Sequence, residues 1–170
     1  MSITTLVTFV EVFDVDLSNK RRTKHLLQNA KREPNKGVKD SSNTIVFNGK
    51  NYHYLPFVYQ GTTINRSGDN IESNLIMGNH PLSMAKAQEA VLNNYFVEVN
   101  VCIVANDDID NVKRVLTTDT WLAASLSYDP EVVEVLLSSA VDAVGVNVPN
   151  IVLTSEAVGK LPVTSDIQNR

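Results

Sequence analysis

The dipeptide Asn48-Gly49 is the strongest local constraint on the fold of this chain. It lies between two short segments in which apolar and polar residues alternate, which is typical of a β-hairpin with a two-residue type I′ turn. A turn of this length pairs Ile45 with Tyr52 and the two residues flanking the turn with each other. In that register four aromatic or aliphatic side chains share one face: Ile45, Phe47, Tyr52 and Tyr54. Residues 43–57 therefore predict a hairpin with one buried face.

Other segments repeat the period of two that is typical of β-strands. The alternation is clearest in 2–17, where only Glu11 interrupts the apolar positions, and in 95–105. In the second of these, Glu98, Asn100 and Cys102 are expected on the face opposite the valines. Further strands are expected on both sides of a turn at 67–70. Others are predicted over 113–117, 121–128, 131–139 and 151–154, with Asp129-Pro130 as a turn.

One segment has the pattern of a helix. Pro81 suits the first turn, and residues 82–92 carry a modest apolar stripe. Many short strands with one helix predict a mainly β (α+β) fold, a small antiparallel β-barrel or sandwich with one helix packed across it. We expect one domain over residues 1–154, with Trp121 and the hairpin face in its core, and a polar C-terminal tail over 155–170.

Composition argues against several classes of protein. The chain has 170 residues, of which 43% are hydrophobic and 20% are charged, enough apolar material for one core. A net charge of −4 does not suggest a nucleic-acid binder. No segment approaches the ~18 consecutive apolar residues of a membrane helix. The first sixteen residues lack the basic leader of a signal peptide. We therefore expect a soluble protein that is made in a cytoplasm.

Residues 18–43 form a basic segment, predicted to be an extended loop that includes a short helix over 23–31 and ends near Pro34. Three interpretations stay open: a solvated loop, a protein-binding arm that orders on an acidic neighbour, or nonspecific contact with phosphates. The lack of interleaved aromatic residues weakens a single-strand binding role. The cations of this candidate subunit-interface arm are Lys20, Arg21, Arg22, Lys24, Lys31, Arg32, Lys36 and Lys39.

The sequence lacks the motifs of catalysis and metal binding. No two of the histidines His25, His53 and His80 have ligand spacing. There is no Gly-x-Ser-x-Gly elbow and no glycine-rich phosphate loop. Cys102 lies inside an expected strand and is interpreted as a small buried thiol. The aspartates of 106–111 do not match a twelve-residue calcium loop and are interpreted as a solvated turn. We predict no catalytic residue, no metal site, no cofactor and a non-enzymatic function.

A succession of motifs runs from the hairpin to the end of the strand-rich region. After the hairpin come a proline, two glycines, a strand ending in Met-Gly-Asn, the helix, a valine-rich strand, a tryptophan-containing strand, a Leu-Leu-Ser-Ser segment, a short loop and a Val-Pro-Asn segment. In order these are 45–52, Pro56, Gly61, Gly68, 75–79, 81–92, 97–105, Trp121, 136–139, 142–145 and 148–153. This succession resembles the phage minor tail protein L family, the tail-tip hub subunits of long-tailed phages. The resemblance covers roughly residues 43–153 and the N-terminal strand.

Two features depart from that family. Its larger members carry a C-terminal cysteine-rich domain that holds an iron–sulfur cluster, whereas this chain has Cys102 alone and cannot build one. The basic segment after the first strand has no counterpart that we can assign. The resemblance therefore points to a minimal hub without the iron–sulfur domain.

The resemblance implies a structural component of the phage tail tip or baseplate hub, made in the host cytoplasm and located in the virion. Such subunits form symmetric homo-oligomeric rings by heterologous contacts, and we expect a trimer rather than a hexamer. The partners implied are the tail tube or distal tail ring and the central hub or fibre proteins. No membrane is implied, and nucleic acid enters only as the passing genome.

Two alternatives remain at this point. One is a distal tail or tail-completion ring protein of sixfold symmetry. The other, from a different class, is a soluble β-barrel that binds nucleic acid or a ligand, an interpretation motivated by the basic segment.

Overall fold

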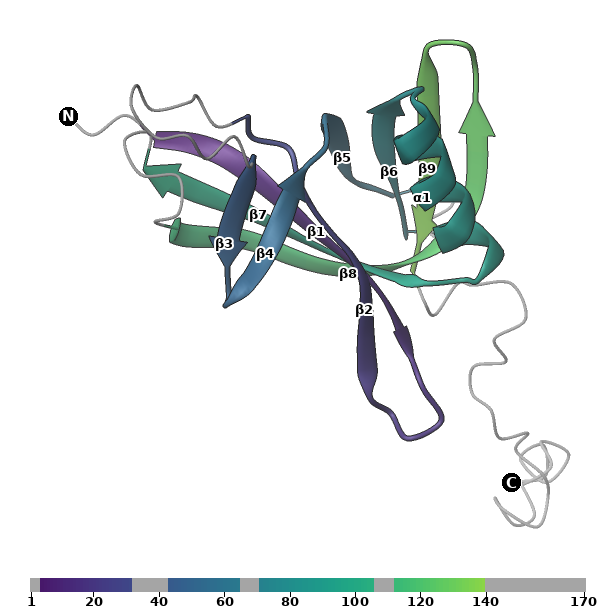
Figure 1. Cartoon of the computed structure of the whole chain (residues 1–170), viewed down its shortest axis with the longest axis horizontal. Coiled ribbons are helices and arrows are strands. Elements are labelled where there is room, and N and C mark those ends of the chain that lie inside the picture. The colour runs from purple at the N-terminus through teal and green to yellow at the C-terminus, as the bar shows by residue number, and fades with distance from the viewer. Residues whose placement is uncertain (1–3, 32–42, 65–70, 106–111, 140–170) are drawn as a thin grey trace, which may run out of the picture.

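The computed structural model describes residues 4–31, 43–64, 71–105 and 112–139. Their nine strands and one helix form a mainly β fold, as predicted (Figure 1). The elements in chain order are β1 (Thr4–Val15), β2 (Arg21–Gln28), β3 (Thr44–Phe47), β4 (Lys50–Tyr54), β5 (Phe57–Ile64), β6 (Ile71–Gly78), α1 (Pro81–Leu92), β7 (Phe96–Ala105), β8 (Val112–Tyr128) and β9 (Val132–Ser138). The prediction of one helix packed across a β-rich fold is confirmed.

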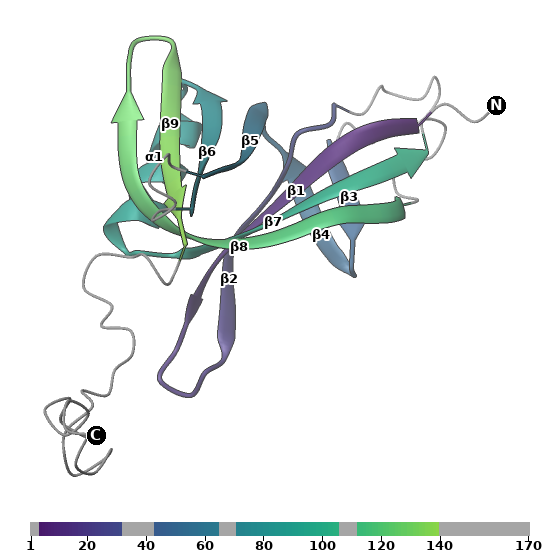
Figure 2. The same ribbon diagram turned by 180° about the vertical axis from the view of Figure 1, so that it is seen from behind.

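All nine strands belong to one sheet, in the order β3-β4-β2-β1-β7-β8-β9-β6-β5. Every neighbouring pair is antiparallel except β2 and β4, which are parallel over two positions, Leu27 beside His53 and Gln28 beside Tyr54. The hydrogen-bonded order ends at β3 and β5, so the described strands form an open sheet. Figures 1 and 2 show long twisted strands β1, β7 and β8, with β3–β4 on one side of them and the β5–β6–β9 group with α1 at one end.

Strand β8 connects the two halves of the sheet. Its first part pairs with β7, and its last part, from Leu122 to Tyr128, pairs with β9. The prediction of two separate strands here is wrong, because the polar residues between them stay in the strand. Thr118 donates to Asn100 at 2.7 Å, and Asp119 accepts from Tyr59 at 3.2 Å. No glycine or proline interrupts the segment, so the chain bends without ending the strand.

Two apolar cores lie on opposite faces of the long strands, because successive side chains of a strand point to opposite sides. Val10 and Val99 pair across β1 and β7 and face the larger core, which includes residues of α1, β6 and β9. Val7 and Cys102 pair on the other face, in the smaller core. Both faces of the predicted alternation on β7 are therefore buried. The smaller core consists of Val7, Phe9, Ile45, Phe47, Tyr52, Cys102 and Val104.

The predicted hairpin is confirmed in register and in turn type. Asn48 and Gly49 have φ values of 49° and 73°, as a type I′ turn requires. Phe47 pairs with Lys50, and the Phe47 ring stacks on Phe9 of β1 with centroids 4.4 Å apart. The hairpin thereby covers the smaller core.

Helix α1 begins at Pro81, as the sequence predicts. The residue before it, His80, caps the helix: its Nδ1 accepts from the Leu82 amide at 3.2 Å. Ser83, Ala87 and Ala90 form the buried face. These small side chains let the helix approach the larger core closely. Among the described residues, no helix has the length and apolar character needed to span a bilayer.

The basic segment differs from its prediction where the structure describes it. Residues 21–28 form strand β2, so the predicted loop and the helix over 23–31 are wrong at these positions. The cause is the unusual length of β1, which offers an edge on which β2 pairs from Arg21 to Gln28. Ion pairs across that edge, Arg22 with Asp16 and Lys24 with Asp14, both at 3.3 Å, reduce the repulsion between the cations.

Several predicted features lie outside the described residues. They are the turn at 67–70, the acidic turn at 106–111, the loop at 142–150, the strand at 151–154 and the tail at 155–170. The remaining strand predictions are confirmed: 2–17 as β1, the two strands around 67–70 as β5 and β6, 95–105 as β7 and 131–139 as β9.

Candidate functional site

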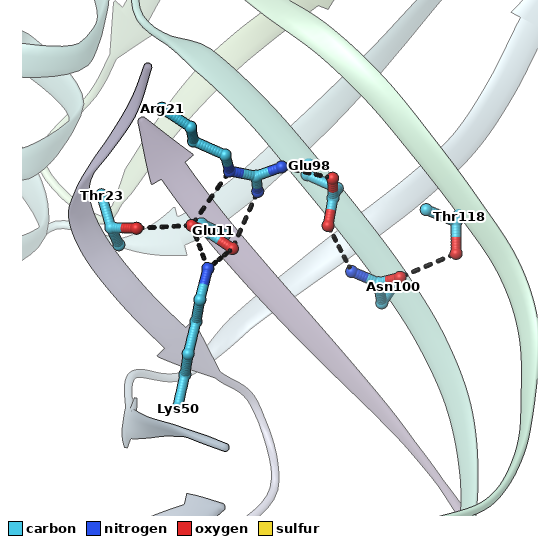
Figure 3. Close-up of polar contacts among 7 residues, drawn as sticks. All are labelled: Glu11, Arg21, Thr23, Lys50, Glu98, Asn100 and Thr118. Atoms are coloured by element: carbon cyan, nitrogen blue, oxygen red, sulfur yellow. Dashed lines mark hydrogen bonds and ion pairs between the residues drawn. The ribbon is translucent and has the colours of Figure 1, made fainter. Parts of the chain in front are cut away.

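A buried carboxylate organises the polar side of the smaller core. Glu11 of β1 is only 3% exposed, yet it lies directly opposite Glu98 of β7 in the sheet register. Two like charges opposite each other on neighbouring strands destabilise a sheet. Arg21 of β2 resolves this conflict because its guanidinium donates to both carboxylates, at 2.8 Å to each (Figure 3).

Two further groups complete the coordination of Glu11. Lys50 of β4 places Nζ 2.7 Å from Oε1 and 2.8 Å from Oε2. The Thr23 hydroxyl donates to Oε1 at 2.6 Å. Beyond Glu98, the Asn100 amide donates to that carboxylate at 3.2 Å and its oxygen accepts from Thr118. One network thus connects β1, β2, β4, β7 and β8 (Figure 3).

The charges of this network balance, with two carboxylates against two cations. Burial raises the pKa of Glu11, but the hydrogen bonds from Lys50, Thr23 and Arg21 outweigh burial and hold the pKa below its ordinary value. The hydrogen bond from Arg21 likewise lowers the pKa of Glu98. Both groups therefore stay ionised at neutral pH. Their oxygens accept from the protein itself, which suits a structural cross-link between strands rather than a proton-transfer site.

The predicted interface arm is largely engaged within the chain where it is described. Arg21 belongs to the Glu11 network and also lies over the Phe13 ring, 3.7 Å from its centroid. Arg22 and Lys24 have the carboxylate partners given above. Lys20 and Lys31 are exposed. The other predicted arm residues, Arg32, Lys36 and Lys39, lie outside the described residues.

The three histidines have different contacts. His25 Nε2 lies 2.9 Å from a Glu89 carboxylate oxygen, and its Nδ1 lies 3.0 Å from Lys86 Nζ. His53 is exposed on β4, and His80 caps α1. Within residues 4–31, 43–64, 71–105 and 112–139, no three potential ligands group into a metal site.

A groove lies between β2, β4 and α1, with a volume of about 650 Å³. Its walls include the histidines His25 and His53 and the lysines Lys24 and Lys86. Its apolar lining includes Leu27 and Leu55. The full lining is Thr23, Lys24, His25, Leu26, Leu27, Asn51, His53, Tyr54, Leu55, Leu82 and Lys86. Thr23 of β2 belongs both to the groove lining and to the Glu11 network.

Most of the remaining predicted residues belong to the core. Ile45, Phe47 and Tyr52 are buried, Tyr54 is half-buried at the groove, and Gly49 completes the turn. Trp121 is buried and its indole N–H donates to the Tyr59 hydroxyl at 3.0 Å. Burial raises the pKa of the Cys102 thiol to about 11, which agrees with its interpretation as a buried thiol.

Sequence reasoning missed Glu11, Glu98 and Lys50 as a linked set. One signal was present, because Glu11 interrupts an otherwise regular apolar alternation, and a charge at a core position needs a partner. The partners come from strands 10 to 87 residues away in sequence, so the sequence could not name them.

No family model matches the chain, and a search of curated proteins finds none that matches it.

Proposed function

We propose that this chain is a structural subunit of a phage tail tip or baseplate hub. In this role it assembles into a symmetric ring that connects the tail tube to the distal host-recognition proteins. The ordered succession of motifs from the hairpin to the Val-Pro-Asn segment supports the proposal. A subunit of this kind acts through its surfaces rather than through a catalytic centre.

One structural observation supports the proposal most: apolar residues are exposed at the end of the long strands, Leu6 on one face of the sheet and Val115 on the other. This projecting end consists of residues 4–8 of β1, 101–105 of β7 and 112–116 of β8 (Figure 2). Leu6 is 61% exposed there, and Val115 and Leu116 are 43% exposed each. Burial of exposed apolar side chains favours a protein contact. A ring subunit buries such an end against its neighbour.

The composition of virions tests the proposal most directly. Mass spectrometry of purified particles from the source phage should detect the chain at three copies per tail, relative to the major tail-tube protein. Six copies would favour the alternative of a distal tail or tail-completion ring. Absence from virions would overturn the structural role.

The projecting end offers a second test. Leu6→Glu places a charge on an exposed side chain, so the chain should fold normally but lose assembly in sedimentation and incorporation into tails. Leu17→Glu is the matched control, because Leu17 is fully exposed in the β1–β2 turn, away from the projecting end. Normal assembly of Leu6→Glu, or equal loss in both variants, would contradict the role of this end.

The nucleic-acid alternative finds less support from the described surface. Arg21, Arg22 and Lys24, which motivated it, bind carboxylates of the same chain. Binding to phosphates would require those cations to leave their partners. A salt titration with DNA should therefore show no tight complex, and a strongly salt-dependent complex would restore this alternative.

A further inference from the structure

Three asparagines share an unusual backbone conformation. Asn19, Asn48 and Asn94 are the described non-glycine residues with positive φ, at 58°, 49° and 49°, and all three are exposed. Asparagine tolerates this left-handed region better than most other side chains. An exposed asparagine can also lose its side-chain amide, because the backbone nitrogen of the next residue attacks the side-chain carbonyl carbon and closes a five-membered ring. The residue that follows each asparagine therefore governs its chemical stability.

The attacking nitrogen is hydrogen-bonded after two of the three asparagines. The Lys20 amide donates to Asp16 Oδ1 at 2.9 Å, and the Tyr95 amide donates to the Ala90 carbonyl at 2.9 Å. A nitrogen whose N–H is bonded in this way must break that bond before it can lose its proton and attack. The side chains of Lys20 and Tyr95 also crowd the approach. Both asparagines are therefore protected in the folded chain.

The backbone nitrogen of Gly49 is not hydrogen-bonded in this way. It lies at the tip of the β3–β4 turn, outside the ladder that ends at Phe47 and Lys50. Among the described residues, neither its N–H nor the side chain of Asn48 has a hydrogen-bond partner. Glycine adds no side chain, and no atom lies within 4 Å of the place that a Cβ would take. Nucleophile and carbonyl are thus both exposed and unobstructed.

We propose that Asn48 is a site of spontaneous conversion to aspartate and isoaspartate. The Gly49 nitrogen forms a bond to Cγ of Asn48 and gives up its proton to water, and the side-chain NH2 takes up a proton and leaves as ammonia. Water then opens the cyclic imide at either of its two carbonyl carbons. Opening at one carbon gives aspartate with the ordinary backbone. Opening at the other gives isoaspartate, whose main chain runs through the former side chain and is longer by a methylene.

The closed turn slows this reaction. The first central residue of a type I′ turn has ψ of roughly 30°, the mirror image of type I, so the Gly49 nitrogen lies opposite the Cβ of Asn48 rather than beside it. Ring closure therefore requires rotation about the Cα–C bond of Asn48, which opens the turn. Local opening costs least at the margins of a structure, and β3 is the last strand of the hydrogen-bonded order. The rate of conversion thus depends on how often the hairpin turn opens.

The two products have different effects on the smaller core. Aspartate keeps the backbone length, so the turn re-forms. Isoaspartate lengthens the main chain and does not fit the two-residue geometry that pairs Phe47 with Lys50. The Phe47 ring then loses its stacking on Phe9, which the intact turn holds at 4.4 Å between centroids. Lys50 likewise loses its fixed position beside Glu11. Isoaspartate formation therefore loosens the hairpin.

Peptide mapping by mass spectrometry tests the site in the full-length chain. During incubation at pH 8, where base removes the amide proton, Asn48 should convert about tenfold faster than Asn19 or Asn94, because glycine leaves its nitrogen sterically open. In 8 M urea the rate at Asn48 should rise about tenfold, since the turn no longer restricts rotation. Labelling by an isoaspartyl methyltransferase distinguishes the two products. No conversion at Asn48, or equal rates at all three asparagines in the folded chain, would overturn the proposal.

Lys20→Gly separates the effect of the structure from that of the sequence motif. This variant creates a second Asn-Gly pair at positions 19 and 20, where the amide of residue 20 still donates to Asp16. In the folded variant Asn19 should convert about fivefold more slowly than Asn48, because its attacking nitrogen stays bonded. In urea the two rates should agree. Equal rates in the folded variant would overturn the role of the free Gly49 amide.

Asn48→Asp supplies the aspartate product alone and is the matched control for the effect on the hairpin. Urea denaturation of this variant should give the same midpoint as the unmodified chain, whereas the purified isoaspartyl chain should unfold at a lower urea concentration. Equal midpoints for the isoaspartyl chain and Asn48→Asp would show that the longer main chain does not loosen the hairpin, and would overturn that part of the proposal.

Discussion

Lys50 Nζ lies 2.7 Å from Oε1 and 2.8 Å from Oε2 of Glu11. This contact connects the tip of the β3–β4 hairpin to the middle of β1. Lys50 directly follows the Asn48-Gly49 turn, so the turn places its side chain over β1. Glu11 is otherwise surrounded by apolar neighbours on β1. The contact therefore couples local turn geometry to the tertiary packing of the β3–β4 hairpin.

Removal of this cation should destabilise the fold moderately. Lys50→Met should lower the free energy of unfolding by about 1–2 kcal/mol, since Glu11 stays buried but keeps Arg21 and Thr23 as donors. Urea denaturation followed by fluorescence of Trp121, the single tryptophan, measures the change. Lys113→Met is the control, because Lys113 is exposed on β8, and its effect should stay within about 0.5 kcal/mol. Equal effects at both positions would contradict the structural role of Lys50.

The Glu11 network should make stability decrease in acid. The pKa of Glu11 in the folded protein is lowered from the ordinary value of 4.5. As the pH falls, Glu11 is therefore protonated at a higher pH in the unfolded chain than in the folded protein. Stability from this group is complete above about pH 4.5 and is lost as the pH falls through the folded pKa. Urea denaturation of the unmodified chain and Glu11→Gln at pH 7, 5, 4 and 3 checks this. The difference in free energy of unfolding between the unmodified chain and Glu11→Gln should shrink as the pH falls. A difference that stays constant with pH would show that the charge of Glu11 does not cause the loss of stability in acid.

The turn glycine should be sensitive to a single methyl group. Gly49 has φ of 73° with no atom within 4 Å of an added Cβ, so Gly49→Ala meets backbone strain rather than a clash and should cost about 1–2 kcal/mol. Gly78→Ala is the matched control, because its surroundings are equally open and its φ lies outside the left-handed region. Thermal unfolding of the two variants compares them. A loss at Gly78 as large as at Gly49 would rule out turn strain as the cause.

The Cys102 thiol should be protected in the folded protein. It is fully buried and its pKa is about 11, so little thiolate exists at pH 8 and reagents cannot reach it. Iodoacetamide at pH 8 should leave the native chain unmodified by mass spectrometry and alkylate it once in 8 M urea. Rapid alkylation without urea would show that the smaller core opens readily.

Local signals predicted the elements that depend on nearby residues. The hairpin register followed from Asn48-Gly49, and the start of α1 followed from Pro81, because turn and cap geometry are set within a few residues. The break expected near Thr118 was wrong, since tertiary partners on β7 and β5 keep that polar segment in strand β8. Strand β2 was missed for a related reason: its basic residues pair with Asp14 and Asp16, a contact that exists only once β1 and β2 are side by side.

Less of the candidate sites than of the secondary structure could be predicted from the sequence. Composition and spacing could exclude familiar metal and nucleophile motifs, and the anomaly at Glu11 could indicate a buried charge. Neither the partner Lys50 nor the groove lined by His25 and Lys86 has a sequence signature, because their members come from separate strands and from the helix.

The sequence by itself determined the mainly β class, the hairpin turn and the single helix, since alternation, turn chemistry and capping act over a few residues. The tertiary structure alone decided the strand order, the parallel pairing of β2 with β4, the bend of β8 and the identity of the ion pairs. These features depend on contacts between distant segments, where burial of apolar faces and neutralisation of buried charge select one arrangement among many that local propensity allows.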